Sequence, residues 1–190
     1  MKLVLASASP RRKELLEMLG FADFEIIPAK GEEIAPPGVG PEELVMALSA
    51  QKAREVAGLC QKDALILAAD TIVWAEGQVL GKPKNEEEAV AMLRRLSGRE
   101  HRVYTGVTLL QNGAEQSRAE ESRVFFRELS EEEIRAYVAT GEPMDKAGAY
   151  GAQGKAALFV RKIEGDFFNV MGLPLCCLGE MLKEQGVVIL

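Results

Sequence analysis

The sequence is poor in the residues that most often carry catalysis and metal binding. Its 190 residues include one histidine, His101, and three cysteines, of which Cys176 and Cys177 are adjacent. A single histidine disfavours a histidine-dependent triad and a metal centre with several histidine ligands. Because no CxxC spacing occurs, the cysteines indicate neither zinc nor a disulfide framework, and a reducing cytoplasm fits them best. We therefore expect chemistry based on carboxylates, lysine, arginine, hydroxyl groups and an oxygen-ligated metal.

The sequence also lacks long apolar segments and an excess of positive charge. No apolar run approaches the length of a membrane span, and the first residues do not follow the pattern of a signal peptide. The formal net charge of −6 argues against general binding to nucleic acid or to membrane surfaces. Hydrophobic residues make up 47% of the chain, so we expect a soluble globular protein of one domain or two small lobes.

The most informative segment is residues 2–16. Residues 2–6 predict a short buried strand, and Ser7-Ala8-Ser9 predicts a tight turn before a helix that begins at Pro10. The cations at residues 11–13 then lie at a helix N-terminus, which already carries partial positive charge. This combination predicts a phosphate-binding turn, and the alternative is a surface helix with a basic first turn.

The rest of the chain alternates between strand and helix patterns. We expect strands at residues 24–28, 64–69, 102–110, 122–128, 157–163 and 187–190, and helices at 41–59, 85–96 and 173–184. Gly77 and Asn112-Gly113 predict hairpin turns, and Ser130 begins a further helix with a capping-box pattern. The alternation predicts an α/β fold with a mixed sheet.

Two charged residues stand in apolar surroundings. Lys52 lies on the apolar face of the helix at 41–59, where a lysine either extends to solvent or finds an anionic partner. Asp70 follows the most apolar strand, at the carboxyl end where open α/β sheets bind ligands. A carboxylate there can bind a metal or act as general base, although an Asp that caps a turn is the alternative. Glu32 or Glu33, on a Gly/Pro-rich loop, could add a second ligand for Mg²⁺ or Mn²⁺.

Two further segments have weaker signals of ligand binding. Lys82 lies between Gly81 and Pro83 after the predicted hairpin. Residues 145–154 form a glycine-rich loop with Tyr150 and Gln153, which could present backbone N–H groups to a ligand or be a flexible turn. We interpret His101 as structural or surface-exposed and the adjacent cysteines as packing residues of the last helix.

Taken in order, several segments resemble the Maf family of nucleoside triphosphate pyrophosphatases. They cover nearly the whole chain and are Ser7-Ala8-Ser9-Pro10-Arg11-Arg12, Gln51-Lys52-Ala53, Ala69-Asp70-Thr71, Gly81-Lys82-Pro83, Tyr104-Thr105-Gly106, Asp145 to Gly154 and Gly165 to Pro174. Each segment is modest support by itself, but the ordered set is specific.

The resemblance implies an α/β fold like that of inosine triphosphate pyrophosphatase, with a mixed, bent central sheet flanked by helices, as a single domain over residues 1–190. It implies two lobes with the site in the cleft, and a cytoplasmic protein that is often a homodimer. It also implies hydrolysis of a nucleoside triphosphate to the monophosphate and pyrophosphate with a divalent metal.

The resemblance also implies a role for each matched residue. Asp70 would be catalytic and bind the metal with Glu33, although the variable loop leaves Glu32 as the alternative. The triphosphate would be bound by Ser7, Ser9, Arg12, Lys52 and Lys82. The residues Arg11, Thr71 and Gln153 match the subgroup that acts on dTTP and UTP rather than on 7-methyl-GTP.

Two other functions remain open. The resemblance also implies a link to septum formation, in which the chain could act through a partner, although intact Asp70, Lys52 and Lys82 disfavour a role without catalysis. It could also be a nucleotidyltransferase, but that class expects a glycine-rich basic loop after the first strand, where this chain has Ser-Ala-Ser-Pro.

Overall fold

The computed structural model describes residues 2–189 and divides into two compact units. Unit 1 consists of the chain up to Asp70, Thr105–Glu120, and the residues from Gly172 onward. Unit 2 consists of Thr71–Tyr104 and Glu121–Met171.

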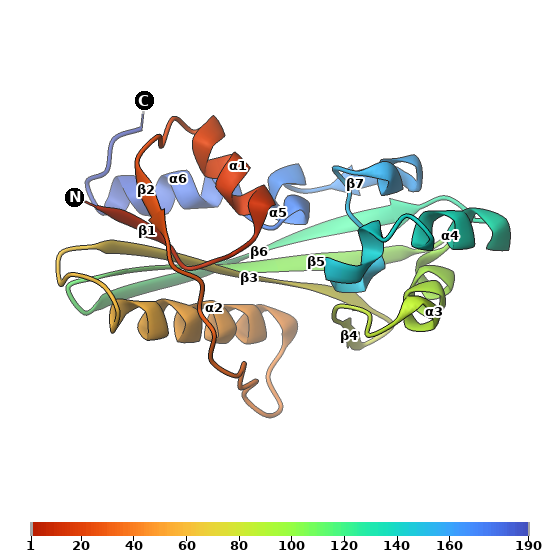
Figure 1. Ribbon diagram of the computed structural model, residues 1–190, viewed down its shortest axis with the longest axis horizontal. Helices are drawn as coiled ribbons and strands as arrows, with labels where there is room; N and C mark the ends of the chain where they lie inside the picture. The colour runs from red at the N-terminus through yellow and green to blue at the C-terminus, as the bar shows by residue number, and fades with distance from the viewer. Residues whose placement is uncertain (1, 190) are drawn as a thin grey trace. The chain divides into compact units, whose positions relative to one another are not determined.

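Unit 1 is a sheet with helices on both of its faces. It contains β1 (Leu3–Leu5), β2 (Phe24–Ile26), part of β3 (Leu65–Ala75), part of β5 (Glu100–Gln111), part of β6 (Ala114–Phe126), α1 (Pro10–Met18), α2 (Pro41–Ala57) and α6 (Leu175–Glu184). The short strand β1 pairs in parallel with both β2 and β3. Figure 1 shows α1 and α6 on one side of these strands and α2 on the other.

Unit 2 combines the remaining parts of the three long strands with short helices. Its further elements are β4 (Gln78–Leu80), α3 (Glu86–Leu96), α4 (Glu131–Val138), η1 (Glu142–Asp145), η2 (Ala147–Ala149), η3 (Lys155–Leu158), β7 (Val160–Glu164) and α5 (Phe167–Met171). Figure 1 shows α3 beside α4, and Arg94 of α3 bonds Glu131 of α4. The Ser130 capping box is present, and Asn85 caps α3 by accepting a hydrogen bond from the Glu88 N–H.

The sheet is mixed, as the sequence predicts. Its strands pair in the order β2-β1-β3-β5-β6-β7, with β4 attached to β3. The pairs β3–β4 and β6–β7 are antiparallel, whereas β1 pairs in parallel. The α/β fold class is therefore confirmed. Among residues 2–189, no helix is long and apolar enough to cross a membrane.

Alternation along β3 determines which of its residues face α2. Side chains of a strand point to opposite faces in turn. The even-numbered residues Ala64, Ile66 and Ala68 share a core cluster with Ala53 and Val56 of α2. Asp70 continues this even-numbered row, so it lies on the face that α2 covers.

Several predicted boundaries are wrong. Asp70 does not end its strand, because β3 continues without a break to Ala75. Residues 155–158 form a 3₁₀ turn rather than the start of a strand, and β7 begins at Val160. Residues 187–189 of the predicted last strand are not extended in a sheet, and residue 190 lies outside the described residues. The adjacent cysteines are not buried either, since Cys176 is exposed and Cys177 half-buried.

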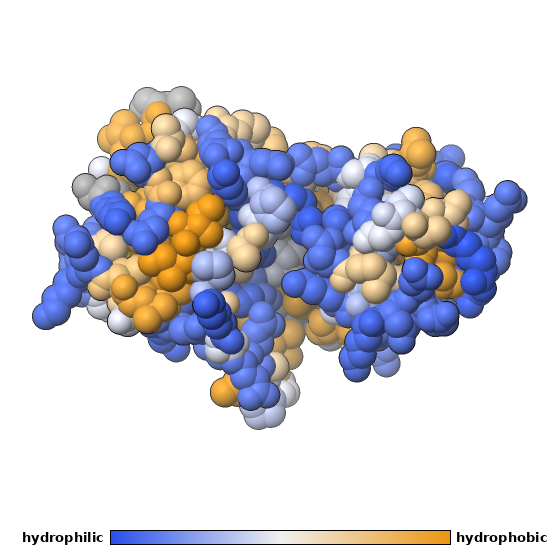
Figure 2. All heavy atoms as spheres, viewed as in Figure 1, coloured by the Kyte–Doolittle hydropathy of each residue, from blue (hydrophilic) through white to orange (hydrophobic). Residues whose placement is uncertain are grey.

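Figure 2 shows hydrophilic residues over most of the face in view, with smaller hydrophobic areas between them. The exposed large hydrophobic side chains belong to both units and include Met18, Ile26, Val79 and Leu158. Scattered residues of this kind are normal on a protein surface.

Candidate active site

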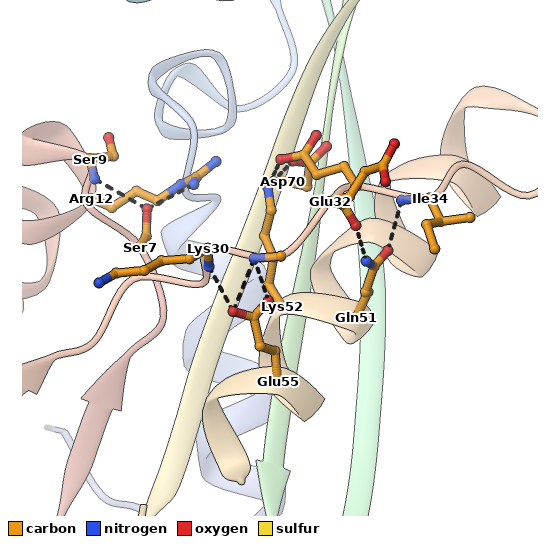
Figure 3. A network of polar contacts seen from close by, with 12 residues as sticks. Ser7, Ser9, Arg12, Lys30, Glu32, Ile34, Gln51, Lys52, Glu55 and Asp70 are labelled. Atoms are coloured by element: carbon orange, nitrogen blue, oxygen red, sulfur yellow. Dashed lines mark hydrogen bonds and ion pairs between the residues drawn. The ribbon is translucent and has the colours of Figure 1, made fainter. Parts of the chain in front are cut away.

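The turn between β1 and α1 gathers hydroxyl groups and a cation. The Ser7 hydroxyl accepts hydrogen bonds from the Ser9 N–H (3.2 Å) and from Nη1 of Arg12 (3.0 Å). Nε of Arg12 donates to the Gly172 carbonyl at 2.8 Å. This bond ties the guanidinium to the segment that leads into α6. The helix α1 begins at Pro10 as predicted, and Ser9 occupies the N-cap position, although its side chain makes no capping hydrogen bond. Figure 3 shows Ser7, Ser9 and Arg12 together at this turn.

Arg12 is a cation in a partly desolvated position. The pKa of Arg12 is lowered to about 10, chiefly by burial and to a smaller extent by the charge of Arg11, while Asp70 and Glu33 oppose this shift. Arg12 therefore stays protonated at neutral pH. The charges that shift this pKa belong to Arg11, Asp70 and Glu33, so all three residues lie near the Arg12 guanidinium.

A close backbone contact positions the helix that carries Lys52. A Cβ added at Gly106 of β5 would lie 2.2 Å from the Val45 carbonyl oxygen of α2. Any larger residue at this position would push α2 away from the sheet. The contact explains the glycine of the Tyr104-Thr105-Gly106 segment, a role that the sequence patterns did not reveal.

Lys52 joins two carboxylates from different elements. Its ammonium group forms ion pairs with Oδ1 of Asp70 and with Oε1 of Glu33, the latter at 2.8 Å. The Lys52 and Asp70 side chains are 18% and 10% exposed, whereas that of Glu33 is 56% exposed. Figure 3 shows Lys52 extending from α2 to Asp70 on β3. Lys52 thus has anionic partners instead of extending alone to solvent.

The carboxylates of Asp70 and Glu33 suit a hard divalent cation whose remaining ligands come from water or a bound substrate. Asp70 and Glu33 contact one common atom, so their carboxylates lie within a few ångströms of a single point. Within residues 2–189, no group of three or more His, Cys, Asp or Glu side chains could hold a metal. Mg²⁺ is commonly held by one or two carboxylates together with substrate phosphates and water. The residues present therefore fit Mg²⁺ or Mn²⁺ that arrives with a phosphorylated ligand.

The other predicted site residues, Thr71, Lys82 and Gln153, belong to unit 2. Thr71 is the next residue after Asp70 on β3, so its side chain points to the opposite face. Val73 shares that face with Thr71, and a Cβ added at Gly148 would lie 2.8 Å from Cγ2 of Val73. Gly148 also has a φ of +67° and donates its N–H to the Gly81 carbonyl at 3.0 Å, next to Lys82. The glycine-rich loop therefore packs against the strand of Thr71 and bonds the turn of Lys82.

Buried polar contacts hold the same loop. Nε2 of His101 and the Tyr150 hydroxyl are 2.7 Å apart, and the His101 residue is only 2% exposed. The Tyr137 hydroxyl donates to Glu142 and accepts from the Gly151 N–H, so further bonds lie next to Gln153. Burial lowers the pKa of His101 to about 4, against a smaller opposing effect of Glu100. His101 is thus a neutral structural residue that supports the loop, whose exposed part includes Gln153.

Comparisons with known proteins give matches over nearly the whole chain. A family model described as Maf-like protein matches residues 2–185. The chain belongs to the Maf family. A relative from Pelotomaculum thermopropionicum is 50% identical over 100% of this chain and 99% of its own length. A relative from Carboxydothermus hydrogenoformans is 54% identical over 98% of this chain and 100% of its own length. Both of these Maf relatives carry the name dTTP/UTP pyrophosphatase.

Solved structures support the fold at lower identity. The Staphylococcus aureus Ham1 protein aligns with a TM-score of 0.56 and 14% identity over 97% of this chain and 100% of its own. A HAM1 protein from Coxiella burnetii aligns with a TM-score of 0.53 and 19% identity over 97% of this chain and 99% of its own. The Maf chain therefore has the Ham1-like α/β fold.

Proposed function

We propose that this chain hydrolyses nucleoside triphosphates, preferentially dTTP and UTP, to the nucleoside monophosphate and pyrophosphate. The curated relatives of that name are about half identical to the chain over its full length. The observation that carries the proposal is the Lys52 ammonium between the Asp70 and Glu33 carboxylates, with Arg12 close by. This arrangement brings together cations for a triphosphate and oxygen ligands for a metal.

Asp70 of unit 1 is the general base of the chemical step in this proposal. Asp70 accepts a proton from the water that attacks the α–β anhydride, a new P–O bond forms, and pyrophosphate leaves with the electrons of the broken bond. Arg12, Lys52 and Lys82 offset the negative charge of the phosphates, and Ser7 and Ser9 donate hydrogen bonds to them. In the free protein, Lys52 offsets the repulsion between Asp70 and Glu33.

Mg²⁺ or Mn²⁺ would be held by Asp70 and Glu33. Such a cation, when bound, supplies further neutralisation of phosphate charge and lowers the pKa of water. The chain itself offers two carboxylates at this point, so we propose that metal and nucleotide bind together.

Base selection is the proposed role of Arg11, Thr71 and Gln153. An amide side chain offers both a donor and an acceptor, which match the carbonyl and N–H edge of uracil or thymine. The fixed loop described above would hold Gln153 in a defined place for this contact. A wrong base would leave buried polar groups of the protein without a hydrogen-bond partner, which disfavours the binding of that base strongly.

We further propose a cytoplasmic homodimer that acts on free nucleotides. The cysteines Cys60, Cys176 and Cys177 are free thiols, which fits a reducing compartment. The net charge of −6 disfavours nucleic acid and membranes as partners. Light scattering of the purified chain would give about twice the monomer mass for a dimer.

A panel assay tests the proposed activity. We expect pyrophosphate and monophosphate from dTTP and UTP with Mg²⁺ or Mn²⁺, much less product from CTP, GTP and ATP, and none after chelation. Release of orthophosphate and diphosphate would place cleavage at another bond and contradict the proposal. Tight nucleotide binding without any hydrolysis would instead indicate a binding protein.

A further inference from the structure

Two side chains of α2, Gln51 and Glu55, bond the backbone of the loop that carries Glu33. The Glu55 carboxylate accepts the N–H of Lys30 at 2.7 Å and the N–H of Gly31 at 3.1 Å from each oxygen. Nε2 of Gln51 donates to the Glu32 carbonyl at 2.5 Å, and its Oε1 accepts the Ile34 N–H at 3.1 Å. Figure 3 shows both side chains beside Lys52 and directed at the loop. We call Gln51 and Glu55 the α2 clamp.

The α2 clamp fixes the backbone on both sides of Glu33. Gln51 bonds the residue before Glu33 and the residue after it, and Glu55 bonds the two residues where the loop begins. The same helix carries Lys52, whose ammonium lies 2.8 Å from the Glu33 carboxylate. One helix therefore provides both the ion-pair partner of the Glu33 side chain and the hydrogen bonds that position the backbone at Glu33.

The ion pair alone is too weak to fix Glu33. Its side chain is 56% exposed, and ion pairs with an exposed partner contribute little to stability. Each hydrogen bond adds a modest stabilisation, which is larger when one partner is charged, as Glu55 is. Four N–H or carbonyl groups of the loop backbone bond the clamp, whereas the ion pair contacts only the Glu33 side chain, so the clamp is what holds the loop backbone on α2.

We propose that Gln51 and Glu55 are positioning residues, which hold Glu33 beside Asp70 so that both carboxylates can bind one divalent cation. This inference rests on the proposed function for the metal site. Neither clamp residue needs to contact the nucleotide or the cation, because each acts through the loop backbone and Glu33. A clamp that only stabilised the fold would leave metal affinity unchanged in a folded variant.

Glu55→Gln is the first test, because it keeps the size of the side chain and replaces one accepting oxygen with an NH₂ group. We expect faster hydrogen exchange at the Lys30 and Gly31 amides. We also expect weaker Mn²⁺ binding, measured by electron paramagnetic resonance with a non-hydrolysable UTP analogue, by about tenfold. The kcat at saturating metal should stay within about twofold, because Asp70 and Lys52 are unchanged.

Glu43→Gln is the matched control. It removes the same charge from the first turn of the same helix, at an exposed position, and should behave as the wild type in exchange and in Mn²⁺ binding. Gln51→Met is the second variant. It removes both bonds at Glu32 and Ile34 without adding charge, and it should weaken Mn²⁺ binding in the same way even if Glu55→Gln fails to fold.

A double-mutant cycle with Glu33→Gln tests the route of the effect. If the clamp acts through Glu33, Mn²⁺ binding by the double variant Glu33→Gln, Glu55→Gln should be no weaker than by Glu33→Gln alone. Additive losses would overturn the positioning role, and so would unchanged Mn²⁺ affinity in Glu55→Gln and Gln51→Met. A wild type that hydrolyses no nucleotide but binds Mn²⁺ would contradict the proposed function and still allow this test. A wild type that binds no Mn²⁺ would overturn both proposals.

Discussion

The two units differ in how they hold their candidate site residues. In unit 1, charged side chains contact one another, as the Lys52 ammonium does with Asp70 and Glu33. In unit 2, contacts between neutral groups hold much of the Gln153 loop, among them the His101–Tyr150 pair and the Gly148 N–H to Gly81 bond, and the Glu142 carboxylate accepts further bonds there. Charged groups suit the binding of phosphates and metal, whereas neutral dipoles in a fixed frame suit the selection of a base.

The difference also predicts how each unit responds to change. Removing one charge from the group in unit 1 leaves the others without compensation, so chemistry is lost before the fold. Changing a polar atom in unit 2 alters which ligand is matched, with less effect on the metal. Three experiments separate these responses, with expected effects that decrease from Asp70 through Gln153 to His101.

The largest effect is expected from Asp70→Asn, which breaks the charged group of unit 1. The amide keeps the size of the side chain but removes the charge that accepts a proton and binds a metal, so we expect turnover to fall by about 10²–10⁴. The folded state should survive, as checked by circular dichroism and thermal melting. Asp63→Asn, at an exposed turn, is the matched control and should keep wild-type turnover. Near-normal turnover in folded Asp70→Asn would show that Asp70 is only a structural residue of β3.

An intermediate effect is expected from Gln153→Glu in unit 2. The carboxylate offers acceptors only, so it no longer matches the N–H and carbonyl edge of uracil or thymine. We expect the kcat/KM ratio of UTP to GTP to fall by about 10–100-fold, with little change in the metal concentration for half-maximal rate. Gln61→Glu makes the same change at an exposed position of unit 1 and should leave the ratio unaltered. An equal loss for all nucleotides would show that Gln153 does not select the base.

Local patterns predicted the elements that local chemistry determines. The Asn112-Gly113 hairpin forms with positive φ at both residues, and the Ser130 capping box and the Pro10 helix start are present. Turns and caps of this kind are determined by a few adjacent residues, so a local sequence pattern is enough to predict them.

Long-range compensation explains what the sequence patterns missed. A carboxylate normally ends a buried strand, but Asp70 lies inside β3 because Lys52 of α2 provides the opposite charge. The polar first half of β6 showed no alternation, yet it pairs along the apolar strand β5. The α2 clamp was missed for the same reason, since nothing local to Gln51 or Glu55 indicates that the loop of Glu33 folds back onto them.

The smallest effect concerns the neutral frame of unit 2 and follows from His101. Its pKa is lowered from 6.5 to about 4, chiefly by burial, so the unfolded chain binds a proton that the folded chain does not between these values. The free energy of unfolding is unaffected by this group above about pH 7 and should fall as the pH decreases from 6.5 toward 4, by about 2 kcal/mol at pH 5. Urea unfolding at pH 7 and pH 5 measures this loss.

His101→Phe and Tyr150→Phe assign that pH dependence to the buried histidine. His101→Phe keeps an aromatic ring between Phe126 and Tyr150 but cannot bind a proton, so its loss of stability between pH 7 and pH 5 should be smaller than that of the wild type by about 2 kcal/mol. Tyr150→Phe removes the hydrogen bond but keeps the buried imidazole, so it should retain the wild-type pH dependence. Equal pH dependence in the wild type and His101→Phe would show that carboxylates, such as those paired with cations in unit 1, dominate the acid response. The contrast between the charged site of unit 1 and the neutral His101–Tyr150 contact of unit 2 would then not extend to stability.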